Sequence, residues 1–232
     1  MNAQQAAGVL LVVLPVTYSA LFTVLGRTFD YPDILRRPTE EVLSRFRAGG
    51  SRLVLTWWGL AMSALLLVPA VVLLADPLGD ADASVVSLAT TFGVLAALVQ
   101  LLGLARWPFA VPHLARAAAD PDARPEVLAA VDVTFQTLNR LFGVAIGEHL
   151  GYLFTGVWTG LVGVAVIQSD TLHPAFGIAG VLLAPLFLAG AAEFVGPFEP
   201  GGWKAAGALV PLTYLAWSLW LFVMGVVLVV TA

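Results

Sequence analysis

The chain has no cysteine and carries little charge. Without a thiol among its 232 residues it can form no disulfide, no thiolate metal site, no iron–sulfur cluster and no cysteine nucleophile. Only 11% of the residues are charged, against about a quarter in an ordinary soluble domain. This composition excludes a cytosolic globular enzyme, a disordered chain and a nucleic-acid-binding module.

Apolar residues dominate the composition of the chain. They make up 59% of the chain, and the mean hydropathy is +0.92. A membrane-spanning helix needs about 20 apolar residues, and the long runs are apolar on all faces, whereas barrel strands alternate. We therefore predict an all-α polytopic membrane protein, organised as one membrane domain over residues 1–232. Its six transmembrane helices are expected at about 6–26, 53–75, 85–106, 141–167, 174–195 and 205–230.

The basic residues indicate an orientation. With six spans, all 11 Lys and Arg residues fall on one side of the membrane, in or beside the first, third and fifth connections. The opposite side has none of them and carries Asp76, Asp80, Asp82 and Asp170. Because positive charge is retained on the cytoplasmic face, we expect a protein of the inner (plasma) membrane with both termini outside the cytoplasm. The first span should be retained, since Met1–Gln5 lacks the basic residues of a signal peptide.

The first cytoplasmic connection contains the signature of a short amphipathic helix over about Thr39–Ala48. Thr39 is a candidate N-cap, Glu40 and Glu41 suit the first turn, and Gly49-Gly50 supplies a stop. Its apolar face would hold Val42, Leu43 and Phe46. Such a helix either seals the end of the bundle or serves as a gate or docking site.

The third connection contains helix-disturbing and helix-starting residues. Pro108 and Pro112 are expected to kink the end of the third span. Pro125 suits the first turn of a new helix. The sequence leaves open whether that helix runs into the fourth span or breaks near Asn139-Arg140.

Ionisable side chains within the spans are the first candidates for a functional site, because burying charge in a bilayer is costly. Glu148 lies eight residues beyond Arg140, or about 12 Å along a helix. Arg106 precedes Arg116 by ten residues, or about 15 Å. We therefore predict that Arg106 and Glu148 lie at similar depth and form a buried ion pair, with Gln100 nearby.

A polar stripe accompanies this pair on the fourth span. Glu148, Tyr152, Thr155 and Thr159 follow the spacing of one helical face. A stripe that points inward would make either a structural polar centre that locks the helices or a site that binds a ligand. Gly143, Gly147 and Gly151 repeat every four residues beside it and allow close helix contact.

The three histidines do not suggest a metal site. His149 points about 100° away from Glu148, so we expect it to hydrogen-bond a neighbouring helix. His113 lies near the cytoplasmic surface and His173 on the outer side, so the three cannot converge on one ion. No nucleotide-binding loop or nucleophile motif appears, and we expect neither a metal nor another cofactor.

Three segments carry a family resemblance: FDYPDILRRPTEEVL (29–43), ARWPFAVPHLA (105–115) and GEHLGY (147–152). With them, nearly the whole chain resembles a bacterial integral-membrane family known as domain of unknown function 4386. The resemblance implies a small polytopic helical membrane protein. It implies no reaction, so it assigns no catalytic residue.

Three classes of function remain open from the sequence. The first is a non-enzymatic protein, in contact with membrane lipids, that binds a lipid or small apolar ligand between its helices. Its site would use Gln100, Arg106, Glu148, His149 and Tyr152. The second is an intramembrane enzyme with Glu148 as acid or base, which the absence of a nucleophile or metal set disfavours. The third is a regulator whose cytoplasmic loops dock a soluble partner.

Overall fold

The computed structural model describes all 232 residues and consists of helices and their connections. Six helical stretches are long and apolar enough to cross a membrane, which confirms the predicted six-helix architecture. They are α1 (Ala3–Phe29), α2 with α3 (Thr39–Leu65 and Leu67–Leu74), α4 with α5 (Ala83–Phe109 and Val111–Ala118), α6 with α7 (Pro125–Leu138 and Gly151–Gln168), α8 (Pro174–Ala191) and α9 (Lys204–Val230). The short helices η1 (Asp33–Arg36) and η3 (Gly196–Phe198) lie in connections, and the π-helix η2 (Asn139–Leu150) joins α6 to α7.

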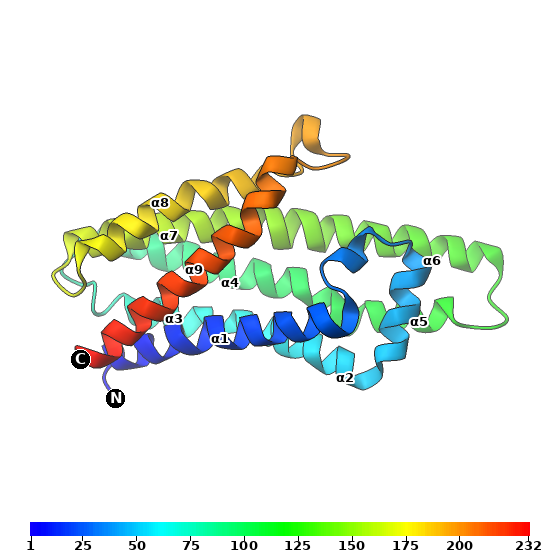
Figure 1. Ribbon diagram of the computed structural model, residues 1–232, viewed down its shortest axis with the longest axis horizontal. Helices are drawn as coiled ribbons and strands as arrows, with labels where there is room; N and C mark the ends of the chain where they lie inside the picture. Colours follow the sequence, from blue (N-terminus) through cyan, green and yellow to red (C-terminus); the bar gives the residue numbers. More distant parts are fainter.

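Most of these helices run along the long axis of the molecule, whereas α9 crosses them obliquely (Figure 1). The first turns of α1 pack against the last turns of α9, where the side chain of Gln4 donates a hydrogen bond of 3.2 Å to the Leu228 carbonyl. The two chain ends therefore lie together, at the end opposite α5 and α6 (Figure 1).

The predicted amphipathic helix forms the first part of α2. The helical backbone is interrupted at Gly50, whose φ of 54° and ψ of −154° lie in a region that glycine tolerates and other residues avoid. Val42, Leu43 and Phe46 are buried, as their spacing predicted. The expectation that Thr39 caps this helix is wrong, because Pro38 occupies the cap position. The Thr39 hydroxyl instead donates to the Asp132 carboxylate and accepts a hydrogen bond of 3.0 Å from Gln136, both on α6.

The helix is divided at Ala110, between the two prolines of the third connection. Pro108 lies inside α4, which ends at Phe109, and Pro112 occupies the first turn of α5, where its missing N–H costs no hydrogen bond. The question left open at Asn139 is also answered. α6, η2 and α7 form one uninterrupted helical stretch over Pro125–Gln168.

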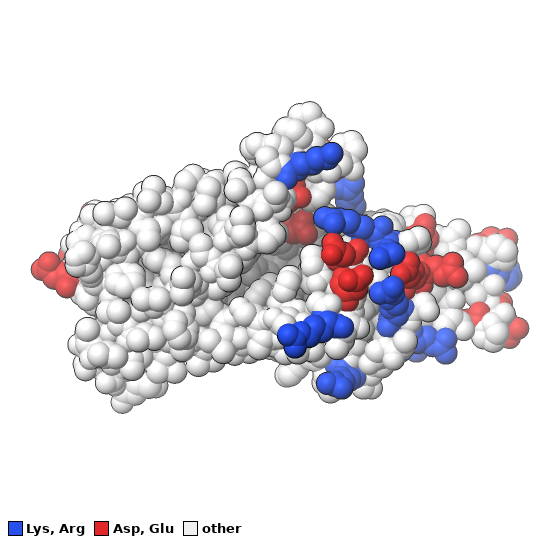
Figure 2. Space-filling model, viewed as in Figure 1, with Lys and Arg blue, Asp and Glu red and all other residues white.

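Charge is segregated along the long axis. Lys and Arg side chains gather toward one end, a broad uncharged band follows, and acidic residues mark the opposite tip (Figure 2). That tip is formed by the connections from α3 to α4 and from α7 to α8, which carry Asp76, Asp80, Asp82 and Asp170. The end with the Lys and Arg side chains is called the basic end below.

Aromatic side chains fill the core near the basic end. Trp57 and Trp107 stack with their ring centroids 4.4 Å apart and their planes 9° apart. Phe29, Phe46 and Phe135 pack around Trp107, and all five side chains are buried. This aromatic cluster ties α1, α2, α4 and α6 together beneath the connection that follows α1.

Candidate functional site: a tyrosine-lined cavity

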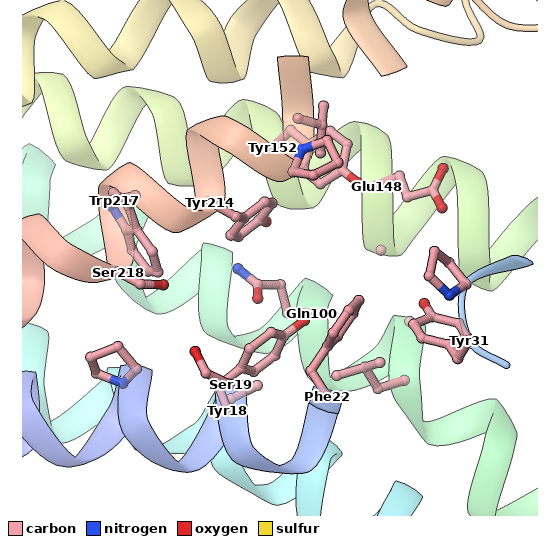
Figure 3. Close-up of a pocket in the computed structure, with 18 of the residues that line it drawn as sticks. Tyr18, Ser19, Phe22, Tyr31, Gln100, Glu148, Tyr152, Tyr214, Trp217 and Ser218 are labelled. Atoms are coloured by element: carbon pink, nitrogen blue, oxygen red, sulfur yellow. The ribbon is translucent and has the colours of Figure 1, made fainter. Parts of the chain in front are cut away.

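A cavity of about 400 Å³, called the main cavity here, lies between α1, α4, η2, α7 and α9. The connection after α1 closes it toward the basic end with Tyr31 and Pro32. Figure 3 shows Trp217 and Ser218 at one end of it and Glu148 and Tyr31 at the other. The main cavity has the size of an ordinary small-molecule site.

All four tyrosines of the chain line the main cavity (Figure 3). They come from four segments: Tyr18 from α1, Tyr31 from the following connection, Tyr152 from α7 and Tyr214 from α9. The rings of Tyr152 and Tyr214 meet edge to face at 5.6 Å. Burial raises the pKa of Tyr31 to about 12, so this phenol stays protonated and able to donate a hydrogen bond.

Tyr152 is the one tyrosine among the site residues that the sequence predicts. Tyr18, Tyr31 and Tyr214 belong to no common motif, and each lies in a segment where an aromatic residue is ordinary. A tyrosine within an apolar span is nevertheless a usable signal, because its hydroxyl needs a partner. The hydroxyls of Tyr18, Tyr31 and Tyr152 form no hydrogen bond with another group of the protein, which leaves them free for a ligand.

The predicted ion pair between Arg106 and Glu148 is wrong. No Arg106 nitrogen lies within the 4.0 Å ion-pair distance of a Glu148 oxygen. The buried Arg106 guanidinium instead donates from Nε to the Asn139 side chain at 3.1 Å and from Nη1 to the Gly103 carbonyl. It also lies 5.4 Å from the centroid of the Trp107 ring.

The depth estimate explains this error. It assumed equal positions for Arg106 and Glu148 along their helices, but the Arg106 side chain folds back along α4 and lies against the stretch of η2 from Asn139 to Gly143. Glu148 lies five residues beyond Gly143, about one π-helical turn further along. Both residues still line the main cavity, so the structure brings them to one space without direct contact.

Glu148 has no partner within the protein. Its carboxylate takes part in no ion pair and accepts no hydrogen bond. It lines the main cavity on one side and, on the other, a second cavity of about 180 Å³ that it shares with His149 and Glu193. Glu148 therefore forms part of the wall between two internal spaces.

His149 faces the second cavity and does not line the main one. Its Nδ1 lies 2.7 Å from the Ala191 carbonyl oxygen on α8, so it hydrogen-bonds a neighbouring helix. The structure brings no three His, Asp or Glu side chains together as metal ligands. Of the candidate residues, Gln100, Arg106, Glu148 and Tyr152 surround the main cavity, and His149 stands apart from it.

Gln100 belongs to a buried hydrogen-bond chain behind the main cavity. Its side-chain nitrogen donates to the Thr155 hydroxyl at 3.1 Å. One turn further along α7, the Thr159 hydroxyl donates to the Thr155 carbonyl at 2.7 Å and accepts from the Trp217 indole at 2.9 Å. The polar stripe thus points inward, and its threonines are satisfied within the bundle while Glu148 is not.

The glycines beside the stripe permit the approach of α4 to η2. A Cβ atom on Gly103 would lie 2.6 Å from the Gly147 Cα, closer than atoms can pack. On η2, Gly143 leaves room for the Arg106 guanidinium, which a Cβ atom would meet at 2.9 Å. Small residues on both helices therefore bring Arg106 and Glu148 to the same wall.

Comparison with known proteins agrees with this architecture. The family model described as a domain of unknown function (DUF4386) matches residues 6–225, nearly the whole chain. The chain belongs to this family. No curated protein and no solved structure matches it. For this DUF4386 protein, a function must therefore be argued from the main cavity itself.

We expect Glu193 to make the stability of the DUF4386 protein depend on pH. This residue follows α8 outside the membrane span, and burial raises its pKa above the ordinary value. A raised pKa stabilises the fold below the unfolded-state pKa, and this contribution is lost as the pH rises through the folded-state value. We expect Glu193→Gln to raise the apparent melting temperature by about 1–2 °C at pH 8, because the ionised form of the parent's half-buried carboxylate is disfavoured in the fold, and to leave it unchanged at pH 4. Thermal unfolding in lipid nanodiscs at both pH values measures the difference, and an equal shift at both would contradict the assignment.

Proposed function

We propose that this protein binds a lipid or small, largely apolar molecule between its helices, in the main cavity. The observation that carries the proposal is the convergence of all four tyrosines with Glu148 and Arg106 on one cavity of about 400 Å³. Sites of this size that are mostly apolar and have a few polar groups typically hold small molecules. Because the polar groups gather toward one end, the ligand that fits best is amphipathic.

The path to the main cavity supports a ligand that arrives from the bilayer. α1 and α9 touch near the chain ends, where a Cβ atom on Gly8 would lie 2.7 Å from the Gly225 carbonyl. From there the two helices diverge toward the basic end (Figure 1), and Figure 2 shows a hollow between them. Ser19 and Phe22 of α1 and Pro211 and Ser218 of α9 line the main cavity along this gap.

The charge distribution supports an orientation for this opening. Under the positive-inside rule the basic end faces the cytoplasm, and both termini lie outside. We place the protein in the inner membrane of a bacterial cell in this orientation. The gap between α1 and α9 then widens toward the inner leaflet, so a molecule dissolved in that leaflet would reach the main cavity without crossing water.

Filling the cavity tests the proposal. Ser218→Trp places a bulky ring in the main cavity, and Ser87→Trp makes the same change on an exposed face of α4 that does not line it. We expect a small molecule to co-purify at about one per chain with the parent protein and with Ser87→Trp, and to be lost from Ser218→Trp. Mass spectrometry of material released from native nanodiscs measures this ratio. Equal retention by all three proteins would contradict the proposal.

A further inference from the structure

The main cavity contains one carboxylate, that of Glu148, and one basic side chain, that of Arg106. The two are not equivalent toward a ligand. Arg106 is already held by the Asn139 side chain, the Gly103 carbonyl and the face of Trp107. Its charge is therefore compensated by dipoles and by a ring. Glu148 accepts no hydrogen bond and has no cation within 4.0 Å, and the charges of Arg106 and Arg140 reach it only from a longer distance.

An unpartnered carboxylate at membrane depth is costly, so it calls for a partner that the chain does not provide. The surroundings of Glu148 favour a positive one. In Figure 3, Tyr152 lies beside Glu148 along the same helical stretch, and Tyr31 lies opposite Glu148 across this end of the cavity. The faces of tyrosine rings attract cations through their quadrupole. On the second cavity, Glu193 adds further negative charge behind Glu148.

We infer that the ligand carries a cationic nitrogen, held by the Glu148 carboxylate between Tyr31 and Tyr152. Its apolar part extends past Tyr214 toward Trp217 and the gap between α1 and α9, where the lining is mainly apolar. The ligand class is thus an apolar amine or ammonium compound with a tail or ring system. This inference rests on the proposed function, because it names the chemistry of the molecule that the main cavity binds.

Three probes that share an apolar tail and differ in their head group separate the contribution of charge to binding affinity from that of hydrophobicity. n-Decylamine is cationic at pH 7, n-decanol is neutral and n-decanoate is anionic. Calorimetric titration into protein-loaded nanodiscs, with empty nanodiscs subtracted to remove partitioning into lipid, gives the dissociation constant of each probe. We expect decylamine to bind the parent at least tenfold more tightly than decanol, and decanoate to bind most weakly of the three.

Two variants assign the preference to Glu148. Glu148→Gln keeps the shape of the side chain and removes its charge, and we expect it to bind amine and alcohol with equal affinity. Glu126→Gln makes the same chemical change at an exposed site on α6 and should behave as the parent. The comparison of heads on the parent needs no variant, so it remains decisive even if Glu148→Gln folds poorly.

The outcomes distinguish the two proposals. If the three probes bind the parent with equal affinity, or if the preference for the amine survives in Glu148→Gln, the proposal that Glu148 holds a cationic nitrogen is refuted. The proposal that the main cavity binds a ligand then still stands. If no probe binds the parent above the level of empty nanodiscs, and nothing co-purifies with it, both the cationic head and the proposed function are refuted.

Discussion

Replacement of Trp107 by alanine is expected to lower the free energy of unfolding by about 3–5 kcal/mol. Trp107 is fully buried and stacks on Trp57 with ring centroids 4.4 Å apart. Phe29 and Phe135 meet its edges at 5.5 and 6.4 Å. Neither indole N–H of the stacked pair has a hydrogen-bond partner, so the substitution removes packing contacts and no hydrogen bond. The guanidinium of Arg106 would also lose the ring it lies over.

The matched control is Trp58→Ala, one residue from Trp57. Trp58 is 47% exposed, so its removal creates no closed cavity and should cost less than about 1 kcal/mol. Reversible unfolding by denaturant in mixed micelles, followed by far-ultraviolet circular dichroism, measures both values. Similar costs for the two substitutions would show that the aromatic cluster does not hold α1, α2 and α4 together.

The second large effect is expected at the contact between α7 and α8. A Cβ atom on Gly163 would lie 2.6 Å from the Gly177 carbonyl and 2.8 Å from the Val181 backbone nitrogen. Both neighbours are backbone atoms that cannot rotate away, so the helices must separate. We expect Gly163→Ala to destabilise the protein by about 1–3 kcal/mol, the range for overpacking, although alanine favours a helix more than glycine does.

Gly59→Ala makes the same chemical change, but we expect it to stabilise the protein and not to destabilise it. A Cβ atom on Gly59 would meet only the side chain of Leu21, at an ordinary 3.5 Å. The gain in helix propensity then remains, worth up to about 1 kcal/mol. The same unfolding assay compares the two variants, and a stabilised Gly163→Ala protein would rule out the close approach of α7 and α8.

Local features of the fold could be predicted well from the sequence. The six spans are visible as apolar runs. The first part of α2 follows from the helical spacing of the apolar residues Val42, Leu43 and Phe46, which are buried in the structure, and its interruption follows from Gly50. That Glu148, Tyr152, Thr155 and Thr159 share one helical face follows from helical periodicity. Each of these depends on the order of residues within one segment.

The candidate site could be predicted only in part, because it depends on relations between segments. Glu148 and Arg106 were recognised by their charge, yet their pairing was wrong because an error of about one turn in relative height is invisible to a count of residues. The Thr39 cap was wrong because the helix begins one residue earlier than expected, with Pro38 at the cap position, and the Thr39 hydroxyl bonds to Asp132 and Gln136 of α6 instead.

Hydropathy and charge are properties of consecutive residues, so the six helices long and apolar enough to cross a membrane, and the gathering of cationic side chains at one end, can be read along the chain. The meeting of Tyr18, Tyr31, Tyr152 and Tyr214 around an unpartnered Glu148 arises only when the helices pack together. That meeting depends on the tilt of α9 and the rotation of each helix about its axis, which are set by packing between helices, such as that at Gly8 and Gly225, and not by the pattern within any one of them.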